Sequence, residues 1–138
     1  MHILIVEDDL TLANSLKGAL EIGGAVVDTV RSVADAMSCA LRVKYDLVIL
    51  DLFVIDGATV SFSNFLRMRT PETPILSITG SCIFANGDHN DAMSADYLIR
   101  KPVSPTEVSD IAFYLIGRGR VPAKAGASGA GTVAQSPR

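Results

Sequence analysis

The sequence predicts a doubly wound α/β domain, with a parallel five-stranded sheet covered by helices on both faces. Short runs rich in β-branched residues alternate with segments whose apolar residues recur at helical spacing. Most of the short runs are apolar on both faces, as strands covered by helices should be. Five strand–helix units in succession imply parallel strands joined by right-handed crossovers.

Five short runs are expected to form the strands of this sheet. They lie at residues 2–6, 25–30, 46–50, 74–78 and 97–99. The third run leads directly into Asp51, and its apolar residues are expected to occupy a central, buried strand. The order of strands and helices along the chain therefore predicts one α/β layer structure.

The first two helices are indicated by apolar stripes with clear start or stop signals. The first stripe ends at Gly23 and Gly24, a helix stop, and comprises Leu12, Leu16, Ala19 and Leu20. The second begins after Ser32, with Asp35 three residues later in a pattern close to a capping box. Its stripe comprises Val33, Ala36, Met37, Ala40 and Leu41.

Three further helices are expected in the second half of the chain. The third helix is expected to use Ala58, Phe62, Phe65 and Leu66. The fifth begins at Ser104 and Pro105, with proline at the first helical position, and uses Val108, Ile111, Ala112, Leu115 and Ile116. Residues 83–95 are crowded with Asn, Asp and Gly, so we expect a short or irregular fourth helix there.

The charged residues divide the chain into two parts. Of its 138 residues, 15 are Asp or Glu and 12 are Lys or Arg, which gives a net charge of -3. Residues 1–117 carry all 15 acids and 8 of the bases, whereas residues 118–138 carry four bases and no acid. The second part is rich in Ala, Gly and Ser and has too few apolar residues to offset its ordering entropy. We expect one folded domain over residues 1–117 and a disordered basic tail over residues 118–138.

The composition excludes several classes of protein. An acidic body argues against a nucleic-acid-binding face, because such faces neutralise phosphates with clustered Lys and Arg. Only two cysteines are present, which argues against a disulfide-stabilised scaffold. The N-terminus has no signal-peptide pattern, and no apolar run approaches the roughly 20 residues of a membrane span. We therefore expect a soluble, cytoplasmic protein that binds neither nucleic acid nor membrane.

Four of the expected strands are followed at once by residues that could carry chemistry. They are Glu7, Asp8 and Asp9 after the first strand, Asp51 after the third, Thr79 after the fourth, and Lys101 and Pro102 after the fifth. In an open parallel sheet, ligands bind beyond the carboxyl ends of the strands, near the point where the strand order reverses. The sequence therefore predicts that several acids, a hydroxyl and an amine meet at one edge.

These residue types favour a metal-assisted phosphoryl site. Glu7, Asp8 and Asp51 would repel one another and raise one another's pKa unless a cation joined them. Carboxylate oxygens suit Mg²⁺, which keeps some of its waters for a phosphate. Lys101 would be out of place in a simple cation site, but an ammonium and the Thr79 hydroxyl suit the oxygens of a phosphoryl group. Asp9 is expected to cap the first helix instead.

At these residues the sequence resembles the receiver domain of bacterial two-component response regulators, in its single-domain, chemotaxis-regulator-like form. The matching features are the ILIVEDD opening, the VILDL strand, the SITG segment and the lysine–proline pair. Asp8 and Asp51 are separated by 43 residues, Asp51 and Thr79 by 28, and Thr79 and Lys101 by 22, close to the spacing usual in that family. The resemblance covers residues 1–117 and implies a flavodoxin-like (βα)5 fold with strand order 2-1-3-4-5.

The resemblance also implies roles for the site residues. Asp51 would be the phosphoacceptor, and Mg²⁺ would be bound by Asp8, Asp51, the backbone carbonyl of Phe53 and, through water, Glu7. Lys101 would pair with a phosphoryl oxygen, and its bond to Pro102 would be cis, a form found mainly before proline. Thr79 would turn toward the phosphoryl group and bias a two-state surface.

A receiver of this kind would not be a conventional enzyme. It would at most phosphorylate and dephosphorylate itself, accepting its phosphoryl group from a sensor histidine kinase or a histidine phosphotransfer protein. Because residues 118–138 are too short and too poor in apolar residues for an effector domain, the output would be contact with a downstream protein. We expect a monomer or a phosphorylation-dependent dimer.

Two departures from the family pattern leave alternatives open. The loop after Asp51 reaches Gly57 about two residues early, and the usual aromatic switch position, three before the lysine, holds Leu98 while Tyr97 stands four before. In a strand this offset reverses the side chain's face, so Tyr97 could be a core residue. One alternative is a degenerate receiver that binds partners without phosphorylation. Another is a haloacid-dehalogenase-like phosphohydrolase, although Phe53 stands where such enzymes usually carry a second aspartate.

Overall fold

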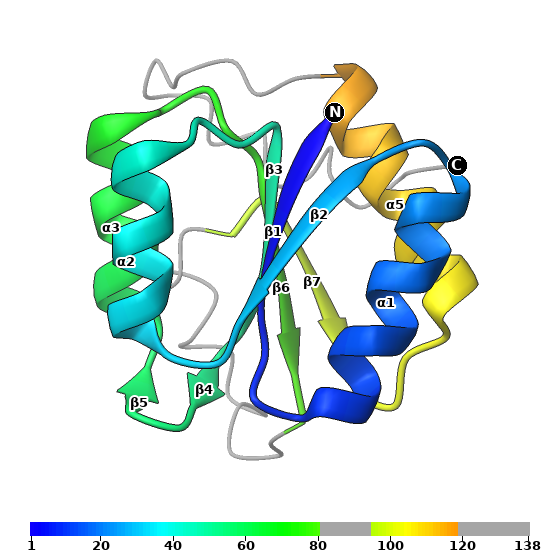
Figure 1. Ribbon diagram of the computed structural model, residues 1–138, viewed down its shortest axis with the longest axis horizontal. Helices are drawn as coiled ribbons and strands as arrows, with labels where there is room; N and C mark the ends of the chain where they lie inside the picture. The colour runs from blue at the N-terminus through cyan, green and yellow to red at the C-terminus, as the bar shows by residue number, and fades with distance from the viewer. Residues whose placement is uncertain (81–94, 119–138) are drawn as a thin grey trace.

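The computed structural model describes residues 1–80 and 95–118 and has three layers. A parallel sheet forms the middle layer, with α1 (Leu10–Ile22) and α5 (Pro105–Arg118) on one face. The helices α2 (Val33–Arg42) and α3 (Val60–Arg69) cover the other face (Figure 1). The predicted doubly wound α/β architecture is therefore confirmed.

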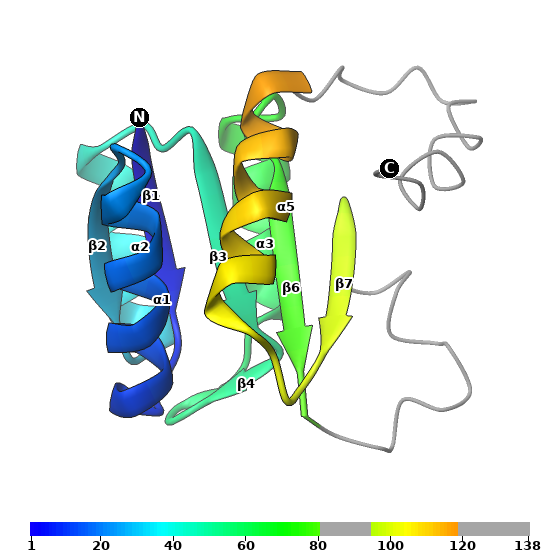
Figure 2. The ribbon, with the colours of Figure 1, turned by 90° about the vertical axis from the view of Figure 1, so that its right-hand side faces the viewer.

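The main sheet has five parallel strands in the order β2-β1-β3-β6-β7. Their bounds are β1 His2–Val6, β2 Val26–Val30, β3 Leu47–Asp51, β6 Ile75–Thr79 and β7 Tyr97–Arg100. Each agrees to within one residue with an expected strand, and the order corresponds to 2-1-3-4-5 for the five predicted strands. Figure 2 shows β2 and β7 at the two edges, which leaves β1, β3 and β6 in the interior.

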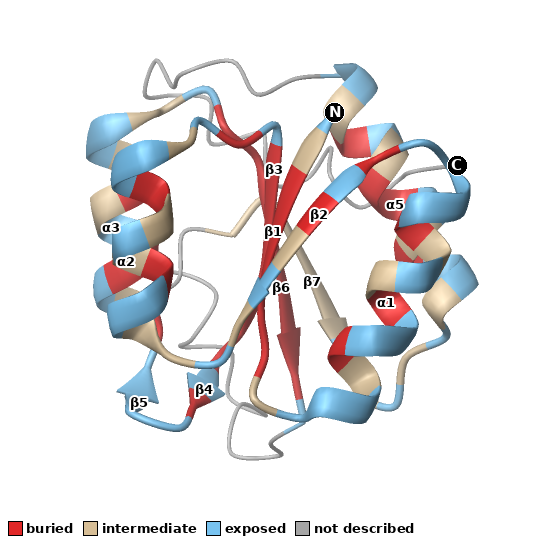
Figure 3. Cartoon of the chain, in the orientation of Figure 1, coloured by how far each residue is buried: buried red, intermediate tan, exposed pale blue. Residues whose placement is uncertain are grey.

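The core consists of two clusters, one on each face of the sheet. Alternate residues of β1 belong to different clusters: Ile3 and Ile5 pack on the α1 and α5 side, and Leu4 and Val6 pack on the α2 and α3 side. This alternation follows from the two-residue repeat of a strand. Figure 3 shows the same division, with buried residues on the helix faces that meet the sheet and exposed residues on the outer faces.

The helix starts follow the predicted capping chemistry. The Asp9 side chain accepts a hydrogen bond from the Leu12 amide at 3.1 Å, which caps α1 as expected. The Ser32 hydroxyl accepts one from the Asp35 amide at 3.0 Å at the start of α2. Both contacts satisfy amides that have no partner within their own helix.

Two residues predicted to lie on apolar helix stripes lie elsewhere. Ala58 belongs to an exposed strand and not to the third helix, because it pairs with Phe53 in a short ladder and the helix begins only at Val60. Leu41 is 56% exposed. Successive residues of a helix are rotated by about 100°, so Leu41 lies off the buried stripe that contains Ala36 and Ala40.

A small antiparallel hairpin lies between β3 and α3 and was not predicted. Its strands are β4 (Phe53–Val54) and β5 (Gly57–Ala58), with Phe53 paired to Ala58 and Val54 paired to Gly57. The hairpin directly follows Asp51 and therefore borders the edge at which the sequence places the site.

Two predicted segments lie outside the described residues. Apart from Ala95, the expected fourth helix at 83–95 belongs to the undescribed segment 81–94. The expected tail at 118–138 is described only at Arg118, the last residue of α5. Within the described ranges, no helix has both the length and the apolar composition needed to cross a bilayer.

Candidate functional site

The predicted site residues follow the carboxyl ends of the central strands. Glu7 and Asp8 come directly after β1, Asp51 is the last residue of β3, and Thr79 is the last residue of β6. Lys101 comes directly after β7. Parallel strands end at the same edge, so the fold brings these segments together at the lower edge of the sheet in Figure 1.

Three carboxylates form a compact cluster at this edge. Glu7, Asp8 and Asp51 each offer an oxygen, and these oxygens all lie within 4.8 Å of one another. Glu7 is 2% exposed and Asp51 is 8% exposed, whereas Asp8 is half-buried. Three anions so close together and so little hydrated need nearby positive charge.

Lys101 supplies one positive charge to this acidic cluster. Its Nζ lies 3.1 Å from Oδ2 of Asp51 and 3.2 Å from Oε1 of Glu7. Its amide donates a hydrogen bond of 2.7 Å to the carbonyl of Thr79. A Cβ on Gly80 would lie 3.1 Å from Cδ of Lys101, so a glycine there leaves room for the lysine side chain. The bond from Lys101 to Pro102 is cis.

The pKa values of Glu7 and Lys101 reflect this environment. Burial, together with the charge of Asp51, raises the pKa of Glu7 to about 7, although the Asp9 amide and Lys101 oppose the rise. For Lys101, burial lowers the pKa, but the hydrogen bond to Asp51 and the charges of Asp51 and Glu7 outweigh it and leave the pKa raised. The ammonium therefore remains charged, while Glu7 can take up a proton near neutral pH.

The donor set of the acidic cluster fits a small divalent cation. Its ligands are carboxylate oxygens, which Mg²⁺ prefers. Oε1 of Glu7 is buried and accepts no hydrogen bond of good geometry, although Lys101 lies 3.2 Å away. Oε2 of the same residue accepts a hydrogen bond from the Asp9 amide at 3.0 Å, which fixes the carboxylate's orientation. One ammonium for three carboxylates leaves an excess of negative charge for a metal to offset.

The backbone around Asp51 is held by a buried threonine that sequence reasoning missed. Thr59 is fully buried. Its hydroxyl donates to the carbonyl of Asp51 at 2.8 Å and lies 3.2 Å from the carbonyl of Leu52, a second acceptor. Thr59 also stands at the start of α3, where its side chain makes no capping hydrogen bond. A threonine before an apolar stripe would be read as a helix cap from sequence, but here the hydroxyl supports the loop that carries Asp51.

The tip of the hairpin is joined to α2 through Asp56, which the sequence also did not single out. Its carboxylate accepts hydrogen bonds from the amides of Val33 at 2.8 Å and Ala34 at 3.2 Å. These hydrogen bonds, the one from Val33 above all, hold the pKa of Asp56 below its usual value. A contact across 23 residues depends on how the hairpin meets the helix, so no local pattern could have indicated it.

The remaining predicted residues take different positions. Thr79 is 2% exposed at the end of β6. The Phe53 side chain is 47% exposed, and its amide donates to Oδ1 of Asp51 at 3.3 Å. Tyr97 packs, with Ile99, against the core cluster on the α1 and α5 side. Tyr97 is half-buried, so it lies against this cluster and is not one of its fully buried residues.

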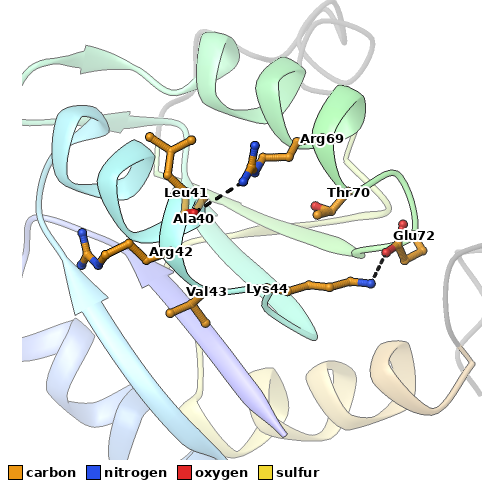
Figure 4. A pocket seen from close by; sticks show the side chains of 8 residues that line it. All are labelled: Ala40, Leu41, Arg42, Val43, Lys44, Arg69, Thr70 and Glu72. Atoms are coloured by element: carbon orange, nitrogen blue, oxygen red, sulfur yellow. Dashed lines mark hydrogen bonds and ion pairs between the residues drawn. The ribbon is translucent and has the colours of Figure 1, made fainter.

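A hollow at the opposite end of the sheet has no link to this chemistry. It has a volume of about 430 Å³ and lies between the C-terminal ends of α2 and α3 (Figure 4). Its three cations already have partners: Arg42 donates to the Ser38 carbonyl, Arg69 to the Leu41 carbonyl, and Lys44 pairs with Glu72. Basic side chains at helix C-termini are explained by the helix dipole alone.

Comparison with known proteins agrees with the geometry. Two curated relatives are the swarming motility regulation protein RssB of Serratia marcescens, 38% identical over 79 residues, and the photosynthetic apparatus regulatory protein RegA of Cereibacter sphaeroides, 29% identical over 107 residues. These alignments cover 57% and 78% of this chain, but only 36% and 58% of the relatives. The chain thus spans less than two thirds of either relative's length.

Solved structures share the fold over most of the chain. A sensor protein from Polaromonas sp. JS666 superposes with a TM-score of 0.74 at 27% identity, covering 85% of this chain and 96% of that one. A CheY-like response regulator receiver domain protein from Methanospirillum hungatei JF-1 gives a TM-score of 0.78 at 22% identity, covering 85% and 94%. The profile of the response regulator receiver domain matches residues 3–112. Because that match covers every strand of the sheet and the folds agree, the chain belongs to the response regulator receiver domain family.

Proposed function

We propose that this chain forms a phosphorylation switch in which Asp51 is the phosphoacceptor. The observation that carries the proposal is the position of Lys101, whose ammonium lies 3.1 Å from Asp51 in a cluster with Glu7 and Asp8. The carboxylates that can bind a metal and the ammonium that can bind a phosphoryl oxygen are therefore adjacent, which is what phosphoryl transfer requires.

The donor in this proposal is a phosphohistidine of a sensor histidine kinase or a histidine phosphotransfer protein. A carboxylate oxygen of Asp51 attacks phosphorus and forms an acyl phosphate, while the N–P bond breaks and its electron pair stays on the histidine nitrogen. Two donors orient the Asp51 carboxylate: the Phe53 amide lies 3.3 Å from Oδ1 and the Lys101 ammonium 3.1 Å from Oδ2. Once the group has transferred, Lys101 pairs with a phosphoryl oxygen.

Mg²⁺ would be held by Asp8, Asp51, the backbone carbonyl of Phe53 and, through water, Glu7. When bound, it supplies positive charge that offsets the charge of the incoming phosphoryl group. The Phe53 amide contacts the Asp51 carboxylate, and the exposed Phe53 side chain would limit the access of water to the acyl phosphate.

Thr79 is the proposed sensor of the phosphoryl group. Its position at the end of β6, with its carbonyl accepting the Lys101 amide at 2.7 Å, couples it to the lysine that contacts the phosphoryl group. A turn of its hydroxyl toward the phosphoryl oxygens would bias a surface that a downstream protein reads. We propose that residues 1–117 form this switch, with residues 118–138 as a separate tail.

A second candidate is a receiver that binds partners without phosphorylation. It is favoured by the position of Tyr97, which packs against the core cluster on the α1 and α5 side. Leu98 then occupies the place where the family usually carries its aromatic switch residue. In this case the site would persist as an acidic cluster, and the output surface would not respond to Asp51.

The decisive experiment is incubation with Mg²⁺ and phosphoramidate or acetyl phosphate, followed by intact-mass analysis. We expect one phosphoryl addition to the parent chain and none to Asp51→Asn. The matched control is Asp110→Asn, which removes an exposed carboxylate on α5 and should be phosphorylated like the parent. Absence of any adduct would favour the second candidate, and repeated turnover of small phosphate esters would indicate a phosphohydrolase.

A further inference from the structure

The hairpin that follows Asp51 is anchored at both ends. At its base, the Thr59 amide donates to the carbonyl of Leu52 at 2.9 Å, and the Thr59 hydroxyl donates to the carbonyl of Asp51 at 2.8 Å. At its tip, the two carboxylate oxygens of Asp56 accept separate hydrogen bonds from the first two amides of α2. The segment between Asp51 and α3 therefore has fixed points on both sides of Phe53.

The tip contact completes the start of α2. Val33 and Ala34 provide the first two amides of that helix, which have no partner within it. Asp56 accepts from both, at 2.8 and 3.2 Å, while the Ser32 hydroxyl accepts from the Asp35 amide at 3.0 Å. Two acceptors from different segments thus share one helix start, and of these two Asp56 is the one that belongs to the hairpin.

The hairpin in turn touches the phosphoacceptor. Phe53 opens β4, and its amide donates to Oδ1 of Asp51 at 3.3 Å. Its neighbour in β4, Val54, is buried in the same core cluster that Val33 packs against, so the hairpin and the start of α2 also share apolar packing. Movement of the hairpin tip would therefore displace the Phe53 amide and, with it, one of the two groups that orient the Asp51 carboxylate.

We propose that Asp56 is a positioning residue for Asp51, acting through Phe53 by anchoring the hairpin to the start of α2. The inference rests on the proposed function, because its consequence is a site held ready to bind Mg²⁺ and accept a phosphoryl group. Residues that support the ligands of a metal in this way commonly contribute about tenfold or more to affinity.

The test compares Asp56→Ala with Ser32→Ala. Both substitutions remove a side-chain acceptor from the start of α2, but only the first releases the hairpin. Amide exchange at Phe53 is measured in the metal-free protein, and the dissociation constant of Mg²⁺ is measured by calorimetric titration. Asp56→Asn retains one carbonyl oxygen as acceptor, so its effects on both measurements should lie between those of the parent and Asp56→Ala.

We expect Asp56→Ala to speed exchange at Phe53 and to weaken Mg²⁺ binding about tenfold, while Ser32→Ala remains close to the parent in both. Equal effects of the two variants would overturn the proposal, because the cause would then be the stability of α2. Parent-like behaviour of Asp56→Ala would overturn it as well. If the parent accepts no phosphoryl group from any donor, the proposed function fails, whereas exchange at Phe53 still decides the role of Asp56.

Discussion

The ammonium of Lys101 is shared between two buried carboxylates, 3.1 Å from Oδ2 of Asp51 and 3.2 Å from Oε1 of Glu7. It joins the end of β7 to the ends of β1 and β3 across the edge of the sheet. With Asp8 beside Glu7 and Asp51, this edge holds three adjacent carboxylates, two of which contact the ammonium. This excess of negative charge determines how the protein should respond to substitution, pH and metal.

Replacing Lys101 should destabilise the metal-free protein. In Lys101→Gln, the carboxylates of Glu7 and Asp51 lose their shared cation, and we expect a loss of about 2 kcal/mol in the free energy of unfolding at pH 8. Urea unfolding measures this loss of unfolding free energy. The control is Lys44→Gln, whose partner Glu72 is well exposed and whose loss should leave stability unchanged. Equal losses in the two variants would contradict the role given to Lys101.

The stability of the metal-free protein should fall as the pH rises from about 4.5 to about 7. The pKa of Glu7 is raised from 4.5 to about 7, so between these values the folded state holds a proton that the unfolded state has released. At roughly 1.4 kcal/mol per pH unit, this window corresponds to a loss of at most about 3 to 4 kcal/mol.

Glu7→Gln should remove this contribution to the pH dependence. Glu21→Gln, a substitution on the exposed surface of α1, should retain it. Thermal unfolding at a series of pH values, in the presence of a chelator, compares the three proteins. If the melting temperature of Glu7→Gln depends on pH as steeply as that of the parent, another group is responsible for the pH dependence.

Mg²⁺ and Asp51→Asn should each stabilise the protein by relieving the same repulsion. At about 100 times its dissociation constant, a ligand specific for the folded state adds about 2.7 kcal/mol. Without metal, Asp51→Asn should be more stable than the parent by about 1 kcal/mol, because one of three adjacent carboxylates is gone. Melting temperatures with and without Mg²⁺ measure both effects, and unchanged melting in both would mean that the carboxylates do not interact as described.

Thr59→Val should weaken both the fold and the site. The substitution removes the hydroxyl that donates to the Asp51 carbonyl, at a cost of about 1–2 kcal/mol in unfolding free energy. Thr73→Val is the control, since that buried hydroxyl donates to the Tyr45 carbonyl at 3.1 Å, away from the site. We expect similar destabilisation of the two variants in urea but weaker Mg²⁺ binding only in Thr59→Val. Equal Mg²⁺ affinities would limit Thr59 to a structural role.

Local periodicity accounts for most of the fold. The β-branched runs predicted all five strands of the main sheet, and the apolar stripes predicted the four described helices. The errors arose at the margins of two stripes: Leu41 lies within α2 but next to the buried face, and Ala58 lies two residues before α3 begins. The hairpin at 53–58 was missed because two-residue strands are too short to show a period.

Strand periodicity was enough to place acids, a threonine and a lysine after strands that end at one edge, because parallel strands all end on the same side of their sheet. How these residues contact one another became visible only in the folded structure. The sharing of Lys101 between Glu7 and Asp51, the burial that raises the pKa of Glu7, and the contact of Asp56 with α2 all join segments far apart in the chain. Such contacts depend on how helices and loops pack, and a repeat of two or 3.6 residues carries no information about that packing.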